Sequence, residues 1–190
     1  MRILIADDEA MIRMGLRAML NDAGHQVVGT ATNGHDALAL AQAAKPDVVI
    51  LDIKMPEMDG LEAARQIMAK QPTAIVMLTA YSQRELVEQA KEAAVFAYLV
   101  KPIKEELLAP ALELARARFG EWTELRGEVA SLQESLEARD LVEKAKRLLM
   151  QRDGLGERQA FMKIHHRSRE RRVPMRQVAE DILRTTKPEE

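Results

Sequence analysis

No cysteine occurs among the 190 residues of the chain, which excludes disulfide bonds, thiolate metal sites and a cysteine nucleophile. The sequence also lacks any apolar run near the roughly 18 residues that a membrane-spanning helix requires, so we expect no membrane segment. The first short apolar run gives way to Asp7-Asp8, a pattern that predicts no secretory signal peptide. Together these absences fit a protein of the reducing cytoplasm.

Charge is unevenly distributed along the chain. Lys and Arg total 28 and Asp and Glu total 30, a formal net charge of −2, which excludes a uniformly basic protein. Residues 1–120 carry 13 basic and 16 acidic residues, whereas residues 141–187 carry 13 basic and 6 acidic residues. This segregation predicts an acidic site in the first part and a surface that faces a polyanion in the last part.

Five short apolar segments alternate with helical patterns in the first 120 residues. Each segment is rich in Val, Ile, Leu or Ala, as strands buried on both faces are. The alternation predicts an α/β fold with a doubly wound, five-stranded parallel sheet. In such sheets ligands bind beyond the carboxyl ends of the strands. The predicted strands are Ile3–Ala6, Val27–Ala31, Val48–Leu51, Ala74–Leu78 and Ala97–Val100.

Polar residues stand at four of these carboxyl ends. Asp7 and Asp8 follow the first strand, Asp52 the third, Thr79 the fourth and Lys101 the fifth. A single Asp at a strand end is usually a cap or turn residue, but three carboxylates at one edge repel one another unless a cation joins them. Hard oxygen ligands with room for water suit Mg²⁺. A carboxylate beside Mg²⁺, an ammonium group and a hydroxyl can accept a phosphoryl group.

Further motifs accompany these polar positions. The full set comprises Asp7-Asp8, Asp52 with Met55-Pro56 and Asp59-Gly60, Thr79-Ala80, and Tyr98-Leu99-Val100-Lys101-Pro102. Over residues 1–120 this set resembles the receiver domain of two-component response regulators. The resemblance implies a flavodoxin-like sheet and a protein that accepts a phosphoryl group without being an enzyme, apart from slow self-dephosphorylation.

The same resemblance implies a role for each residue at this edge. Asp52 is the implied phosphoacceptor, with a sensor histidine kinase as its donor. Mg²⁺ would be held by the carboxylates of Asp8 and Asp52, by the main-chain carbonyl of Lys54, and through water by Asp7. The residues that contact the phosphoryl group or switch with it would be Thr79, Tyr98 and Lys101.

After Pro110 the pattern predicts one long helix. Its apolar residues follow one another at alternating steps of three and four, which is a heptad seam. We predict a coiled-coil linker over residues 121–139 that forms a homodimer. The alternative is a single amphipathic helix packed on its own domain. The seam residues are Trp122, Leu125, Val129, Leu132 and Leu136.

Residues 140–187 predict a small all-α domain of three short helices. The apolar stripes begin at Leu141, Ala160 and Met175, and Gly154 allows a helix to end before the second stripe. The middle helix is strongly cationic. Although most charge runs are only solvated faces, this density favours nucleic-acid binding. The candidate RNA-binding residues are Lys146, Arg147, Lys163, His165, His166, Arg167, Arg171, Arg172 and Arg176.

The arrangement favours RNA over DNA. The glycine turn precedes the middle helix, and the charges gather there rather than on a final recognition helix. The tail also resembles the ANTAR domain, an RNA-binding unit of transcription antiterminators. The matching residues are Ala145-Lys146, Leu148-Leu149-Met150, Gly154-Leu155-Gly156, Ala160-Phe161, Arg167 and Val178-Ala179.

The two resemblances together imply a response regulator. Phosphorylation of Asp52 would promote dimerisation and the binding of RNA hairpins in leader transcripts, which prevents a terminator from forming. Two alternatives stay open at this point: a DNA-binding transcriptional regulator, and a phosphorylation-dependent relay that docks a partner protein.

Overall fold

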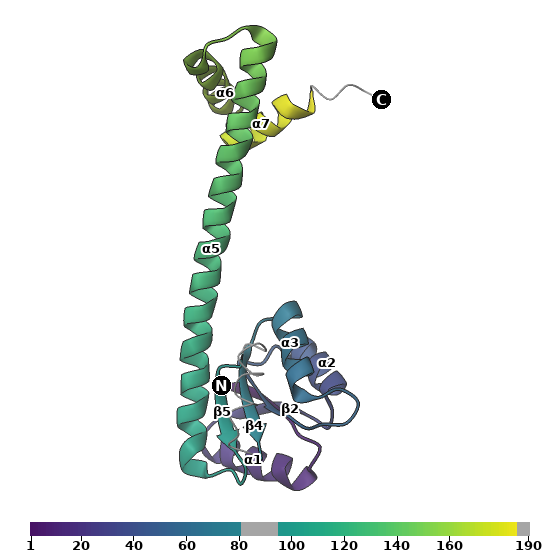
Figure 1. The fold of residues 1–190 in the computed structure, drawn as a ribbon. Coiled ribbons are helices and arrows are strands. Elements are labelled where there is room, and N and C mark those ends of the chain that lie inside the picture. Colours follow the sequence, from purple (N-terminus) through teal and green to yellow (C-terminus); the bar gives the residue numbers. More distant parts are fainter. Residues whose placement is uncertain (81–94, 186–190) are drawn as a thin grey trace. The chain divides into compact units, whose positions relative to one another are not determined.

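The structure is a computed structural model that describes residues 1–80 and 95–185. The chain forms two compact units, Met1–Thr123 and Glu124–Glu190, here called the N-terminal and C-terminal units. Helix α5 (Glu105–Asp153) contributes residues to both (Figure 1). Within the described ranges, no helix is both long enough and apolar enough to cross a bilayer.

The N-terminal unit contains a five-stranded, fully parallel sheet with the strand order β2-β1-β3-β4-β5. This is the order of flavodoxin-like doubly wound sheets, and it confirms the predicted fold class. The predicted strands agree with the observed ones to within one residue at each end. The strands are β1 (Arg2–Ala6), β2 (Gln26–Ala31), β3 (Val48–Asp52), β4 (Ala74–Thr79) and β5 (Ala97–Val100).

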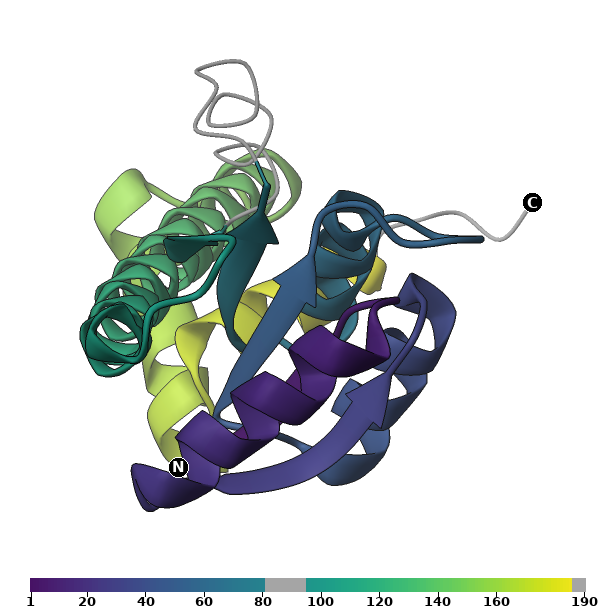
Figure 2. The same cartoon turned by 90° about the horizontal axis from the view of Figure 1, so that it is seen from below.

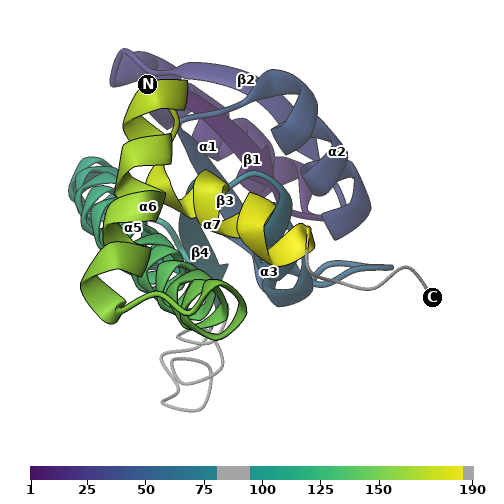
Figure 3. The same ribbon diagram turned by 90° about the horizontal axis from the view of Figure 1, so that it is seen from above.

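Helices cover both faces of this sheet. Helices α2 (Gly34–Ala44) and α3 (Gly60–Lys70) lie side by side on one face, as Figure 3 shows. Helix α1 (Ala10–Asp22) crosses the other face (Figure 2). All residues of β3 and β4 are therefore buried, which explains their continuous apolar sequence.

Glycine is required where the chain leaves β3. A Cβ atom at Gly60 would overlap the main-chain carbonyl oxygen of Asp52. The N–H of Gly60 donates to the carbonyl oxygen of Ile53 at 2.9 Å, and the side chain of Asp59 caps α3 by accepting from the N–H of Glu62 at 2.8 Å. The Asp59-Gly60 pair thus folds the loop after β3 back against the strand end that carries Asp52.

Helix α5 begins earlier and ends later than the sequence pattern indicates. It starts five residues before Pro110 and continues to Asp153, so the first of the three predicted tail helices is the end of this long helix rather than a separate element. Gly154 follows with a positive φ of 64°, the left-handed conformation in which glycine commonly ends helices.

The C-terminal unit has its own small core. It is closed by α6 (Glu157–Arg171) and α7 (Met175–Arg184), which pack on the last turns of α5. The side chain of Ser168 donates to the carbonyl oxygen of Val173 at 2.6 Å and fixes the turn between them. The buried residues are Ala145, Leu149, Ala160, Ile164, Val178, Ala179 and Ile182.

Candidate functional site

Three carboxylates converge at the carboxyl edge of the sheet. Asp7 and Asp8 directly follow β1, and Asp52 is the last residue of the adjacent strand β3. One ligand oxygen from each of the three lies within 4.8 Å of the others. Asp7 is fully buried, Asp52 is 6% exposed, and Asp8 faces solvent. The structure therefore brings together the acidic residues that the sequence singled out.

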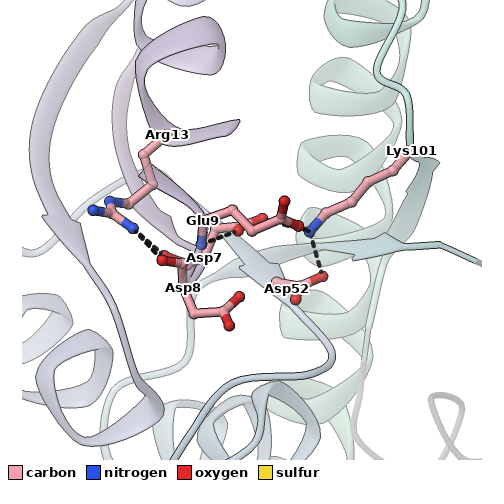
Figure 4. Close-up of polar contacts among 6 residues, drawn as sticks. All are labelled: Asp7, Asp8, Glu9, Arg13, Asp52 and Lys101. Atoms are coloured by element: carbon pink, nitrogen blue, oxygen red, sulfur yellow. Dashed lines mark hydrogen bonds and ion pairs between the residues drawn. The ribbon is translucent and has the colours of Figure 1, made fainter. Parts of the chain in front are cut away.

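Lys101 joins this cluster from the end of β5. Its Nζ lies 2.8 Å from Oδ2 of Asp7 and 3.1 Å from Oδ1 of Asp52. Glu9, which the sequence prediction did not include, is a third partner at 3.3 Å (Figure 4). Burial opposes the charge on Lys101, but its hydrogen bonds and ion pairs with Asp7 and Asp52 outweigh this and raise its pKa. The ammonium group consequently stays charged at neutral pH.

The balance of charge at Asp52 is different. Burial is the main cause that raises the pKa of Asp52, and the charges of Asp7 and Asp8 act in the same direction. The hydrogen bond and positive charge of Lys101 counteract this only in part. One ammonium group thus faces an excess of carboxylates, and an added cation would stabilise the ionised form of Asp52.

The loop that carries the first two acids is anchored from α1. Nη1 of Arg13 donates to the main-chain carbonyl oxygens of Asp7 at 2.7 Å and Asp8 at 3.0 Å, as Figure 4 shows. The N–H of Glu9 also donates to Oδ1 of Asp7 at 2.9 Å. Sequence reasoning missed Arg13. Its position in the first turn of the helix after the acidic pair was the available signal.

A cavity of about 270 Å³ opens beside the cluster. Thr79, at the end of β4 and 7% exposed, forms part of its wall. Tyr98 lies in β5 and is half-buried, which raises its pKa. It is not among the described residues that line the cavity. The lining residues are Asp8, Glu9, Asp52, Ile53, Lys54, Thr79, Ala80 and Lys101.

The donors at this cavity fit a magnesium ion. Asp8, Asp52 and Lys54 all line it, and oxygen donors with access to water are what Mg²⁺ requires. Asp7 is already engaged by Lys101 and by the N–H of Glu9. Its carboxylate therefore suits a contact through water better than direct coordination.

The predicted heptad seam divides into two parts. Trp122 packs in the N-terminal unit, with ring centroids 6.0 Å from Phe119 and 6.3 Å from Phe96. The other four side chains are more than half exposed on α5. Their exposed fractions are 62% for Leu125, 53% for Val129, 64% for Leu132 and 63% for Leu136.

Several predicted RNA-binding residues are engaged within the protein. Lys146 is only 8% exposed, and its Nζ pairs with Glu143 at 2.7 Å and Glu157 at 2.8 Å. It ties α5 to the first turn of α6. Four more of the predicted residues have a carboxylate partner in this unit: Lys163 with Asp153, His166 with Glu170, Arg171 with Asp181, and Arg176 with Glu134, Glu137 and Glu180.

The remaining predicted cations divide by exposure. Arg147, Arg167 and Arg172 are exposed and have no ion pair within residues 1–80 and 95–185. His165 is half-buried and its ring lies against Phe161. Two arginines of α6 outside the predicted set are also exposed and without an ion pair in the described parts of the chain, Arg158 and Arg169.

Comparison with known proteins agrees with both units. The family described as "Response regulator receiver domain" matches residues 3–113, and the ANTAR domain family matches residues 130–183. The transcriptional regulatory protein PdtaR of Mycobacterium tuberculosis H37Rv is 52% identical over 184 residues, which cover 97% of this chain and 90% of that protein.

Two further similarities cover about the first 60% of the chain. Chemotaxis protein CheY of Thermotoga maritima is 40% identical over 112 residues, which cover 58% of this chain and 93% of that protein. The crystal structure of the response regulator domain of Thermotoga maritima CheB superposes with a TM-score of 0.56 at 30% identity, covering 60% of this chain and 96% of that one.

Proposed function

The chain belongs to the response regulators that combine a receiver domain with an ANTAR domain, and we propose that a sensor histidine kinase phosphorylates it on Asp52 to control RNA binding. The proposed parts are the receiver domain at residues 1–120, a coiled-coil linker at 121–139, and the ANTAR domain at 140–187. The observation that carries the proposal is the contact of Lys101 with both Asp52 and Asp7 at the edge of a cavity.

In the proposed transfer, a carboxylate oxygen of Asp52 bonds to phosphorus while the bond from phosphorus to the kinase histidine nitrogen breaks. Lys101, already 3.1 Å from Asp52, neutralises charge on the incoming phosphoryl oxygens. The hydroxyl of Thr79, on the cavity wall, donates a hydrogen bond to the same group. Mg²⁺, when held by Asp8, Asp52 and the carbonyl of Lys54, with Asp7 through water, supplies further positive charge.

The proposed switch is a shift between two conformations. A phosphoryl group on Asp52 gives new partners to Lys101 and Thr79, and so favours the conformation that draws them together. Tyr98 would move inward behind Thr79. Lys101 already holds Glu9 and Asp7, so the new contact competes with an existing one.

The proposed output requires two copies of the chain. The exposed fractions of Leu125, Val129, Leu132 and Leu136 support a second α5 as the covering partner, because a heptad seam buries its apolar residues against another helix. A dimer presents two ANTAR domains, and a second linked RNA hairpin then binds at a high effective concentration. We propose leader transcripts as targets, antitermination as the outcome, and the cytoplasm as the location.

Exposed cations on α6 support RNA as the ligand. Arg158, Arg167 and Arg169 are exposed there, and Arg172 is exposed directly after the helix, which suits contacts to phosphates. We propose no catalysis beyond slow loss of the phosphoryl group from Asp52.

The test combines phosphorylation with RNA capture. The protein is treated with an acyl phosphate and Mg²⁺, and the expected result is one acid-labile phosphate in the wild type and in Asp22→Asn, an exposed control, but none in Asp52→Asn. Crosslinking to cellular RNA should then recover more leader transcripts from phosphorylated protein than from Asp52→Asn. Equal capture of duplex DNA and hairpin RNA at fixed salt would contradict the RNA assignment.

A further inference from the structure

Helix α6 exposes an aromatic residue that its own core does not use. The small core is closed by Ala160 and Ile164, whereas Phe161 is 41% exposed. The ring of Phe161 lies nearly parallel to that of His165, with centroids 6.2 Å apart and an interplanar angle of 19°. The two residues are four apart on one helix face, so the imidazole supports one side of the phenyl ring.

Phe161 separates two hollows on the surface of the C-terminal unit. The larger, of about 530 Å³, is lined by Phe161 of α6, by Val142 of α5, and by Pro174 and Met175 at the start of α7. The smaller, of about 440 Å³, is lined by Phe161 with Lys146, Glu157 and Arg158. Phe161 is the described residue that lines both. The larger hollow has mostly apolar walls, and its charged lining residues are Arg139, Glu143 and Arg176.

The charges around these hollows indicate what kind of molecule enters. Arg158 lies three residues before Phe161, and Arg169 lies four residues after His165. Both arginines therefore lie on the helix face that carries Phe161 and His165, and both are exposed. A purely apolar protein segment would leave these guanidinium groups unpaired. A nucleobase offers a flat apolar face on a chain of phosphates, which matches an aromatic surface flanked by arginines.

We propose that Phe161, supported by His165, is the stacking surface for one unpaired base in the loop of the bound RNA hairpin, and that this base enters the larger hollow. This inference rests on the proposed RNA-binding function and adds how the loop is recognised. Arginines contact phosphates whatever the sequence, but a base held in a hollow makes recognition depend on the loop.

The test uses synthetic hairpins with a fixed stem and a randomised loop. The tightest-binding hairpin is remade with each loop position abasic in turn, which removes a base and keeps the phosphates. The wild type should lose about 10-fold or more in affinity at one abasic position. Phe161→Leu should lose a similar factor on the intact hairpin but under about 2-fold on that abasic hairpin. Phe161→Trp, which keeps an aromatic face, should retain most of the affinity.

Met162→Ala provides the matched control. Met162 is also exposed, at 54%, and adjoins Phe161, but it lines neither hollow; its replacement should leave both affinities unchanged. The abasic scan uses the wild type, so it remains informative even if Phe161→Leu fails to fold. If no abasic loop position lowers the affinity of the wild type, the inference is overturned. The inference is also overturned if Phe161→Leu lowers the affinity for the intact and the abasic hairpin by the same factor.

Two further outcomes separate the inference from its premises. If the wild type binds no hairpin at any salt concentration, the proposed RNA function fails, and the inference with it. If Phe161→Leu alters the sedimenting mass of the protein without RNA, the hollow holds a second copy of the chain and the base assignment is wrong.

Discussion

The Nζ of Lys101 lies 3.1 Å from Oδ1 of Asp52, although Asp52 ends β3 and Lys101 follows the last residue of β5. This contact does not fully stabilise the negative charge of Asp52, because burial and the charges of Asp7 and Asp8 still raise the pKa of Asp52. Ionisation of the carboxylate at the centre of the site therefore carries a cost in stability. That cost is measurable.

We expect Asp52→Asn to be more stable than the wild type at pH 7 without divalent ions, by about 1 kcal/mol, a typical size for one substitution. The folded-state pKa of Asp52 lies above its ordinary value of 3.8, so the folded protein binds more protons between these two pKa values. The contribution of Asp52 to the free energy of unfolding of the wild type is at its full value below pH 3.8. It falls as pH rises through the folded-state pKa. The stability of Asp52→Asn relative to the wild type should therefore rise over the same pH range and then level off.

Urea unfolding in EDTA, followed by the fluorescence of Trp122, measures this difference. Trp122 packs against Phe119 and Phe96 and so reports on the N-terminal unit. Asp22→Asn, an exposed control on α1, keeps Asp52, so its stability should follow that of the wild type across the pH range. A wild type more stable than Asp52→Asn at pH 7 would contradict the assignment of burial as the dominant effect.

Arg13→Gln should weaken Mg²⁺ binding about 10-fold, the lower end of the usual effect of residues that orient metal ligands. Arg13 holds the main-chain carbonyls of Asp7 and Asp8 without occupying a carboxylate oxygen, so its loss loosens the acids rather than removing one. Calorimetric titration with Mg²⁺ measures the affinity. Arg17→Gln, an exposed arginine on the same helix, is the control, and an equal loss in both variants would indicate a general charge effect.

The convergence of the acids with Lys101 was predictable because the carboxyl ends of parallel strands share one edge. Once the strands were placed, Asp7, Asp52, Thr79 and Lys101 had to end near each other, and this required no knowledge of side-chain rotamers. Arg13 was not predicted because its hydrogen bonds go to main-chain carbonyls, so only its position in the first turn of the helix after the acidic pair hints at its role.

The C-terminal unit was predicted less completely. The apolar stripe that begins at Ala160 was predicted to include Phe161, which is 41% exposed. Charge alone, moreover, does not show which cations are paired. Lys146 looked like any other cation, whereas its exposure of 8% follows from its place between Glu143 and Glu157. Trp122 fitted the heptad spacing, yet aromatic neighbours in the N-terminal unit hold its ring.

These pairings predict different salt dependence for two cations. Arg169→Gln should lower the slope of log affinity for RNA against log salt by about 1, the effect of losing one phosphate contact. Lys146→Gln should leave the slope unchanged, because Glu143 and Glu157 already neutralise its ammonium group; instead it should lower the melting temperature of the C-terminal unit. Fluorescence anisotropy at several salt concentrations separates the two effects. A slope reduced equally by both changes would mean that Lys146 leaves its partners to contact RNA.

Leu132→Glu should abolish the increase in dimer that we propose for the phosphorylated protein. Leu132 lies within the exposed part of the seam, and two carboxylates facing each other across a dimer interface cost several kcal/mol. Sedimentation with and without an acyl phosphate measures the mass, and Gln133→Glu adds the same charge at an exposed position outside the seam.

Because the seam acts through the second ANTAR domain, Leu132→Glu should bind a single hairpin as the wild type does but lose most of the extra affinity for two linked hairpins. An unchanged preference for linked hairpins in a monomeric variant would show that both hairpins bind one copy of the chain.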